Sequence, residues 1–87
     1  MTFALRPGVS ATDTDHGMVL LDESTGRYWQ LNGTGALILH ALLDGATPGQ
    51  TARLLGGRHP ALTSGRAAAD VAFFIRSLTE ARLAVDA

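Results

Sequence analysis

The chain has 87 residues, of which 46% are hydrophobic, and a formal net charge of −1. This length predicts a single domain whose core is close to the lower size limit for independent stability. The chain contains no cysteine, which excludes disulfides and thiolate metal sites. It also lacks an apolar run of the roughly 18 residues that a membrane span needs, and its first residues do not resemble a signal peptide. We therefore expect a soluble, cytoplasmic protein that contacts no membrane.

Two strands are predicted before residue 22. The first covers residues 5–12 and lies at an edge or begins with a bend, because Pro7 has no N–H to donate to a ladder. Residues 13–17 resemble a turn, and the apolar run 18–21 has the length of a short strand. A loop over 22–26 then predicts a hairpin.

The third predicted strand, 27–31, carries the only Tyr and the only Trp of the chain. With a side-chain period of two, Trp29 and Leu31 share one face and Tyr28 and Gln30 share the other. We expect Trp29 and Leu31 to face the core.

Two helices are predicted between residues 34 and 55. The first covers 34–43, with Asn32 as its N-cap. Three leucines are expected to point inward: Leu39, Leu42 and Leu43. The second covers 48–55, since Thr47 and Gln50 form a capping box and the glycines that follow Leu55 break the pattern.

A third helix is predicted to be capped by Thr63 or Ser64 and to run to about Ala81. A short extended tail follows, in which Leu83 and Val85 close the core. Steps of 100° per residue place five residues in one apolar stripe: Ala68, Val71, Ala72, Ile75 and Leu78. Phe74 lies on the shoulder of this stripe. Phe73 points away from it, on the side of Arg66, Asp70 and Ser77.

The order of three strands and then three helices predicts an α+β fold of winged helix-turn-helix type, with a three-stranded antiparallel sheet. No enzyme chemistry is indicated. The three histidines, His16, His40 and His59, lack the spacing of metal ligands. The Gly33-x-Gly35 pair lacks the other residues of a phosphate loop and is better interpreted as a flexible helix start. We expect no metal, no cofactor and no catalytic residue.

A binding surface is the remaining possibility. The strand over 27–31 has no Pro, Lys or inward charge to block its edge. Such an edge beside a helix can accept a peptide as an added strand. Apolar residues that could line this groove are Tyr28, Val71, Phe73 and Phe74, although the alternative is that Val71 and Phe74 are simply core and Tyr28 simply packs.

Three segments in this order resemble PqqD-like proteins: "Tyr28-Trp29-Gln30-Leu31-Asn32", "Thr34-Gly35-Ala36-Leu37" with "Leu42-Leu43-Asp44-Gly45", and "Ala69-Asp70-Val71" with Phe74 and Leu78. These proteins are the recognition elements of ribosomally made peptide natural products. A free-standing chain of this size is most similar to those of lasso-peptide clusters, so residues 1–87 are expected to form one leader-peptide recognition domain.

The resemblance implies a non-catalytic peptide chaperone. It would bind a leader peptide, typically with a Tyr-x-x-Pro element, as a strand added to 27–31 in a groove against the third helix. The bound precursor would pass to a separate leader peptidase, a transglutaminase-like cysteine protease, and then to a lasso cyclase. The peptide-binding residues expected from the resemblance are Arg27, Tyr28, Trp29, Gln30, Leu31, Ala67, Asp70, Val71, Phe73 and Phe74.

Two assignments within this set stay open. A register error of one residue would exchange the faces of Tyr28 and Gln30 with those of Trp29 and Leu31. Asp70 could pair with a basic leader residue or merely solvate its helix.

Two other functions are compatible with the predicted fold. A winged helix could bind DNA, but the second helix offers only Gln50, Thr51 and Arg53 for base contacts, and the seven arginines are scattered. We therefore expect no nucleic-acid partner. A plain dimerisation or protein-interaction module, with Phe73 in its interface, is the other alternative.

Overall fold

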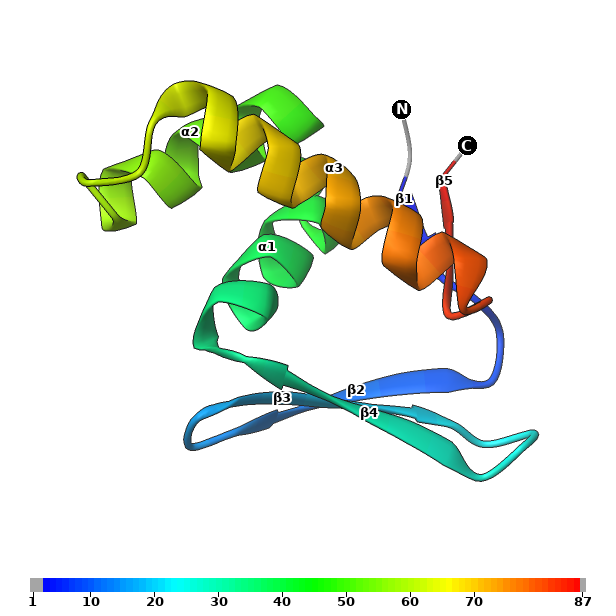
Figure 1. Ribbon diagram of the computed structural model, residues 1–87. Coiled ribbons are helices and arrows are strands. Elements are labelled where there is room, and N and C mark those ends of the chain that lie inside the picture. Colours follow the sequence, from blue (N-terminus) through cyan, green and yellow to red (C-terminus); the bar gives the residue numbers. More distant parts are fainter. Residues whose placement is uncertain (1–2, 87) are drawn as a thin grey trace.

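The computed structural model describes residues 3–86, which form five strands and three helices. The elements are β1 (Phe3–Leu5), β2 (Val9–Thr14), β3 (Gly17–Asp22), β4 (Arg27–Asn32), α1 (Gly33–Leu43), α2 (Pro48–Arg58), α3 (Ser64–Glu80) and β5 (Ala84–Asp86). Strands β2, β3 and β4 form an antiparallel sheet in that order, and the three helices form a layer on one of its faces (Figure 1). The predicted α+β class, with a three-stranded antiparallel sheet and three helices, is confirmed.

The N-terminal segment differs from the single strand predicted over 5–12. Gly8 adopts a φ of 84°, which only glycine reaches without strain, and the chain turns there. The segment before this turn, β1, pairs antiparallel with β5 at the other end of the chain, whereas β2 pairs with β3. The prediction of one strand is therefore wrong. The strand also ends two residues later than predicted, because Asp13 and Thr14 belong to β2 rather than to a turn.

The β3–β4 hairpin is confirmed and is one residue longer at most ends than predicted. Its loop closes with Gly26 at a φ of 76° and with the Asp22 carboxylate accepting hydrogen bonds from the backbone N–H and the hydroxyl of Ser24. At the other end of the hairpin, Gly17 lies opposite Asn32. A Cβ at Gly17 would overlap the carbonyl oxygen of Leu31, so this position requires glycine.

The predicted helix starts are also confirmed. The Asn32 side chain accepts a hydrogen bond of 2.8 Å from the Gly35 N–H and caps α1. Thr47 and Gln50 form both bonds of the predicted capping box. Thr63, one of the two predicted candidates, caps α3.

Helix α2 runs three residues past its predicted end, through both glycines to Arg58. Glycine lowers helix propensity by about 1 kcal/mol relative to alanine. The fully buried Leu55 nevertheless holds this turn against the rest of the core, and the helix ends only before Pro60. The predicted end at Leu55 is wrong because tertiary packing outweighs local propensity here.

The buried face of α3 is rotated relative to the predicted stripe. Val71, Ile75 and Leu78 are buried as predicted, but Ala67 is buried in place of Ala68 and Ala72, which are exposed. An alanine methyl is compatible with either side of a stripe, so packing against α1 and α2 decides the phase.

Two further predicted core positions are wrong, and three are confirmed. Leu43 is 38% exposed at the end of α1, whereas Leu39 and Leu42 are buried. In the C-terminal tail Leu83 is buried as predicted, but Val85 is exposed. Because strand side chains alternate, the neighbour that faces inward is Ala84.

Candidate functional site

Strand β4 has a free edge. It pairs with β3 on one side and, within the part of the chain that the structure describes, with no strand on the other. The Leu31 carbonyl oxygen points at Gly17 on β3. Since the backbone polar groups of a strand alternate between its two sides, the N–H and C=O groups of Tyr28 and Gln30 point toward the free edge. This edge therefore offers donors and acceptors to an added strand.

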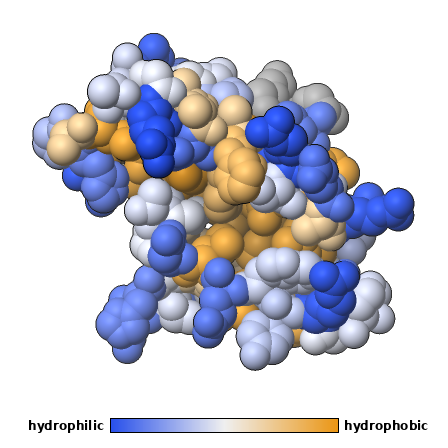
Figure 2. All heavy atoms as spheres, viewed as in Figure 1, coloured by the Kyte–Doolittle hydropathy of each residue, from blue (hydrophilic) through white to orange (hydrophobic). Residues whose placement is uncertain are grey.

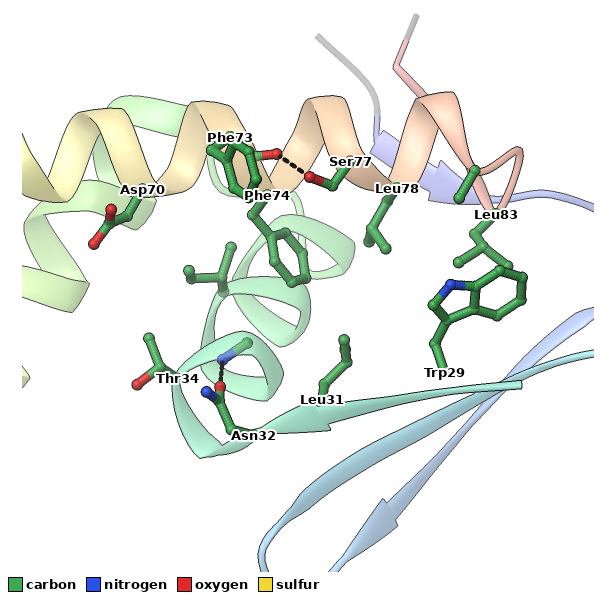
Figure 3. A pocket seen from close by; sticks show the side chains of 13 residues that line it. Trp29, Leu31, Asn32, Thr34, Asp70, Phe73, Phe74, Ser77, Leu78 and Leu83 are labelled. Atoms are coloured by element: carbon green, nitrogen blue, oxygen red, sulfur yellow. Dashed lines mark hydrogen bonds between the residues drawn. The ribbon is translucent and has the colours of Figure 1, made fainter. Parts of the chain in front are cut away.

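An open groove of about 360 Å³ lies between β4 and α3 (Figure 3). Its floor and walls come from β4, the start of α1, one side of α3 and the segment after α3. The lining residues are Trp29, Leu31, Asn32, Thr34, Gly35, Ile38, Asp70, Phe73, Phe74, Ser77, Leu78, Ala81 and Leu83. Figure 2 shows the same region as a hollow with hydrophobic side chains gathered between the helices above and the sheet below.

Phe74 is the central aromatic side chain of the groove and points from α3 toward β4 (Figure 3). It packs closely on the first turn of α1, since a Cβ built at Gly35 would lie 3.4 Å from Phe74 Cε2 and 3.3 Å from Leu31 Cβ. Gly35 thus lets α1, α3 and β4 approach one another. The "Asn-Gly-Thr-Gly" segment has a packing reason here, in addition to the Asn32 cap.

The two ends of the groove differ in charge. Asp70 and Thr34 lie at one end (Figure 3), where the Asp70 carboxylate is paired with Arg66 one turn away on α3 at 3.2 Å. Toward the other end, the Arg27 guanidinium lies 4.7 Å from the ring centroid of Trp29, a cation–π geometry. The groove therefore has a carboxylate at one end and a guanidinium near the other.

The structure brings five of the ten predicted site residues together as groove lining: Trp29, Leu31, Asp70, Phe73 and Phe74. Phe73 is 64% exposed, on the side of α3 where it was predicted. Trp29 and Leu31 do pack against the core as predicted, but as half-buried residues that also line the groove.

The other five lie elsewhere. Ala67 and Val71 are 1% exposed and belong to the core. The prediction that Val71 lines the groove is therefore wrong. Tyr28 and Gln30 lie on the sheet face that points away from the helices, so the prediction that Tyr28 lines the groove is also wrong. The physical reason is strand alternation, because the groove lies on the same face of β4 as the core. Arg27 stacks on Trp29 at the groove margin.

Sequence reasoning missed several lining residues. Ser77 and Leu78 on α3, and Ala81 at its C-cap, each lie four positions beyond another lining residue (Phe73, Phe74 and Ser77, respectively). The helical period alone could have identified them. Ile38 and Leu83 reach the groove from separate elements, and no local pattern marks them.

The structure gathers no metal-binding cluster of three or more histidine or acidic side chains among residues 3–86. His40 contacts a single carboxylate, that of Asp13 on β2, at 2.8 Å. None of the helices in this range has the length and apolar content to cross a membrane.

Comparisons with known proteins give a family and two similar structures. Residues 17–84 match the family described as coenzyme PQQ synthesis protein D (PqqD). A solved structure described as lasso peptide synthetase B1 complexed with the leader peptide is 43% identical, with a TM-score of 0.92 over 99% of this chain and 100% of that one. A second, TbiB1 in complex with the TbiA(beta) leader peptide, shares the fold at 23% identity, with a TM-score of 0.86 over 100% of this chain and 98% of that one.

No curated protein sequence matches the chain. The family match covers most of the residues, including the hairpin, all three helices and every groove-lining residue. The chain therefore belongs to the PqqD family.

Proposed function

We propose that this chain binds the leader segment of a ribosomally made precursor peptide, of the lasso-peptide type, as a strand added to β4. The observation that carries the proposal is that the free edge of β4 is also one wall of an apolar groove. In strand addition, main-chain hydrogen bonds supply affinity and pockets for alternate side chains supply selectivity. The β4 edge offers the main-chain hydrogen bonds, and the groove offers a pocket for side chains.

The comparison with the 43%-identical protein supports this proposal, because that protein is described in complex with a leader peptide and the two chains share nearly their whole length. The groove chemistry agrees with it. Leu31, Phe73 and Phe74 provide an apolar surface for aromatic or aliphatic leader side chains, such as those of a Tyr-x-x-Pro element.

The role we infer is recognition and delivery, without a catalytic step. The groove lining includes one ionisable side chain, Asp70, which is already paired with Arg66. General acid–base or nucleophilic chemistry needs a partner group within hydrogen-bond reach. We infer that residues 1–87 act as one recognition domain that presents the precursor to a separate cysteine peptidase and then to a lasso cyclase.

The arrangement of helices and hairpin also fits a winged helix-turn-helix description, for which DNA binding is the alternative function. The charge of the chain argues against it. The net charge is −1, and the exposed side of α2 offers Gln50 and Arg53, whereas DNA-binding surfaces concentrate positive charge. A dimerisation role would rest on the exposed Phe73, which the peptide proposal also uses.

A fluorescence-anisotropy titration tests the proposal. The fluorescein-labelled probes are a lasso-type leader peptide that contains a Tyr-x-x-Pro element and a random DNA duplex. We expect saturable binding of the leader, lost when its Tyr and Pro are changed to Ala, and no change with Arg53→Ala. Salt-sensitive binding of DNA, weakened by Arg53→Ala and without leader binding, would contradict the proposal.

A further inference from the structure

The sheet face that points away from the helices carries an incomplete apolar row. Leu21 on β3 lies directly opposite Tyr28 on β4, and the two side chains are 36% and 66% exposed. Within the described residues no helix covers this face (Figure 1). On the far side of Tyr28 the row ends at the free edge of β4. The next row, which runs from Val19 to Gln30, ends in a polar side chain.

An added strand would continue both rows. An antiparallel guest, which preserves the antiparallel pattern of the sheet, exchanges backbone hydrogen bonds with the edge-facing groups of Tyr28 and Gln30. Residues directly opposite each other share a face. The two guest residues opposite Tyr28 and Gln30 therefore lie on the open face, and those opposite Trp29 and Leu31 enter the groove.

Resting on the function proposed above, we propose that the guest strand is read on both faces and that Tyr28 selects an apolar guest residue on the open face. Read from its N-terminus, the guest would have an apolar residue opposite Leu31, a polar one opposite Gln30, an apolar one opposite Trp29 and an apolar one opposite Tyr28. The last position is the one that the groove does not specify.

The exposure of Tyr28 supports a role in binding. The ring contributes little to the core, and its face of β4 is separate from the groove. A guest side chain beside it would complete a three-residue row with Leu21. Cross-strand pairs of aromatic and aliphatic residues stabilise a sheet, and an isolated exposed Tyr gains nothing comparable.

A double-mutant cycle tests the proposal. The probe is the fluorescein-labelled leader peptide found in the complex of the 43%-identical protein, substituted one position at a time by Ala. Tyr28→Thr keeps β propensity and removes the ring. We expect this variant to weaken binding about two- to fivefold and to be non-additive with Ala at one guest position. The control is Leu54→Thr, at an exposed leucine of α2, for which we expect unchanged binding.

A proline scan of the same peptide fixes the register independently. In an antiparallel guest, the residue opposite Trp29 directs its N–H away from β4, so proline there removes no hydrogen bond to the protein. Proline opposite Gln30 or Tyr28 removes one, and we expect at least about a tenfold loss there. The position coupled to Tyr28 must fall in the proline-sensitive set.

The outcomes separate the two proposals. If neither this leader nor a Tyr-x-x-Pro leader peptide binds the unsubstituted chain, the proposed function is wrong, and the reading by Tyr28 is wrong with it. If the leader binds but Tyr28→Thr has no effect, or is additive with Ala at every guest position, the function stands and the further inference is overturned. Non-additivity between Tyr28→Thr and Ala at a guest position that tolerates proline would also overturn the further inference.

Discussion

Replacing Gln30 by proline removes a hydrogen-bond donor from the free edge of β4 and leaves the β3–β4 ladder in place. Because the Leu31 carbonyl points toward β3, the Gln30 N–H points away from it, to the side where a guest strand would pair. Proline is tolerated on an edge strand when its missing N–H faces solvent. We therefore expect Gln30→Pro to fold and to lose peptide affinity.

The size of the loss follows from the group left without a partner. A guest carbonyl that pairs with Gln30 would lie beside the proline ring, and an unsatisfied buried acceptor costs about 1–3 kcal/mol, equivalent to roughly 5- to 150-fold in Kd. Gln30→Thr retains the N–H and β propensity. We expect this matched variant to bind almost as well as the unsubstituted protein.

Leu31→Pro supplies the opposite control. Its N–H points toward β3, so proline there breaks a bond within the sheet, and the half-buried leucine side chain is also lost. We expect a lower Tm for Leu31→Pro and a nearly unchanged Tm for Gln30→Pro, measured by circular dichroism, with affinities measured by isothermal titration calorimetry. Unchanged affinity of Gln30→Pro would refute strand addition at this edge, and a collapse of its Tm would refute the assigned direction of the N–H.

Three further substitutions probe the groove and its supports. Phe74→Ala removes the central aromatic of the groove, and we expect at least about a tenfold loss of peptide affinity by calorimetry, with a chain that still unfolds cooperatively in urea. Leu83→Ala, at a residue with 0% exposure, should lower the free energy of unfolding by about 2–5 kcal/mol, and a urea midpoint equal to that of the unsubstituted chain would contradict its core position. Gly17→Ala places a methyl on the Leu31 carbonyl oxygen; a loss of about 1–3 kcal/mol in the free energy of unfolding is expected from this overpacking, and thermal denaturation at an unchanged Tm would show that the hairpin adjusts freely.

Local signals in the sequence were sufficient wherever one short segment carries all the information. The loop of the β3–β4 hairpin and the helix caps at Asn32, Thr47 and Thr63 were predicted from residues within a few positions, and all are present. A cap is a contact between a side chain and the backbone of the next turn, so it needs no distant partner.

Predictions failed where two distant segments meet. Nothing near Phe3 indicates that β1 pairs with β5 more than 75 residues later, and the glycines after Leu55 suggested a helix end that packing against α3 prevents. The rotation of the buried face of α3 toward Ala67 has the same origin, since alanines on both sides of the stripe satisfy the periodicity equally.

The candidate site shows the same division. Two relations follow from the sequence alone, because they depend only on the periods of a strand and a helix. An unblocked strand carries Tyr28 and Trp29 on opposite faces, and Phe74 lies at the shoulder of an apolar helix stripe from which Phe73 points away. That Trp29 and Phe74 form the groove, while Tyr28 faces the open side of the sheet, depends on the packing of the helices on the sheet. The physical reason is that a groove exists between elements, and the helix layer that covers one face of β4 is placed by long-range packing, which no single segment encodes.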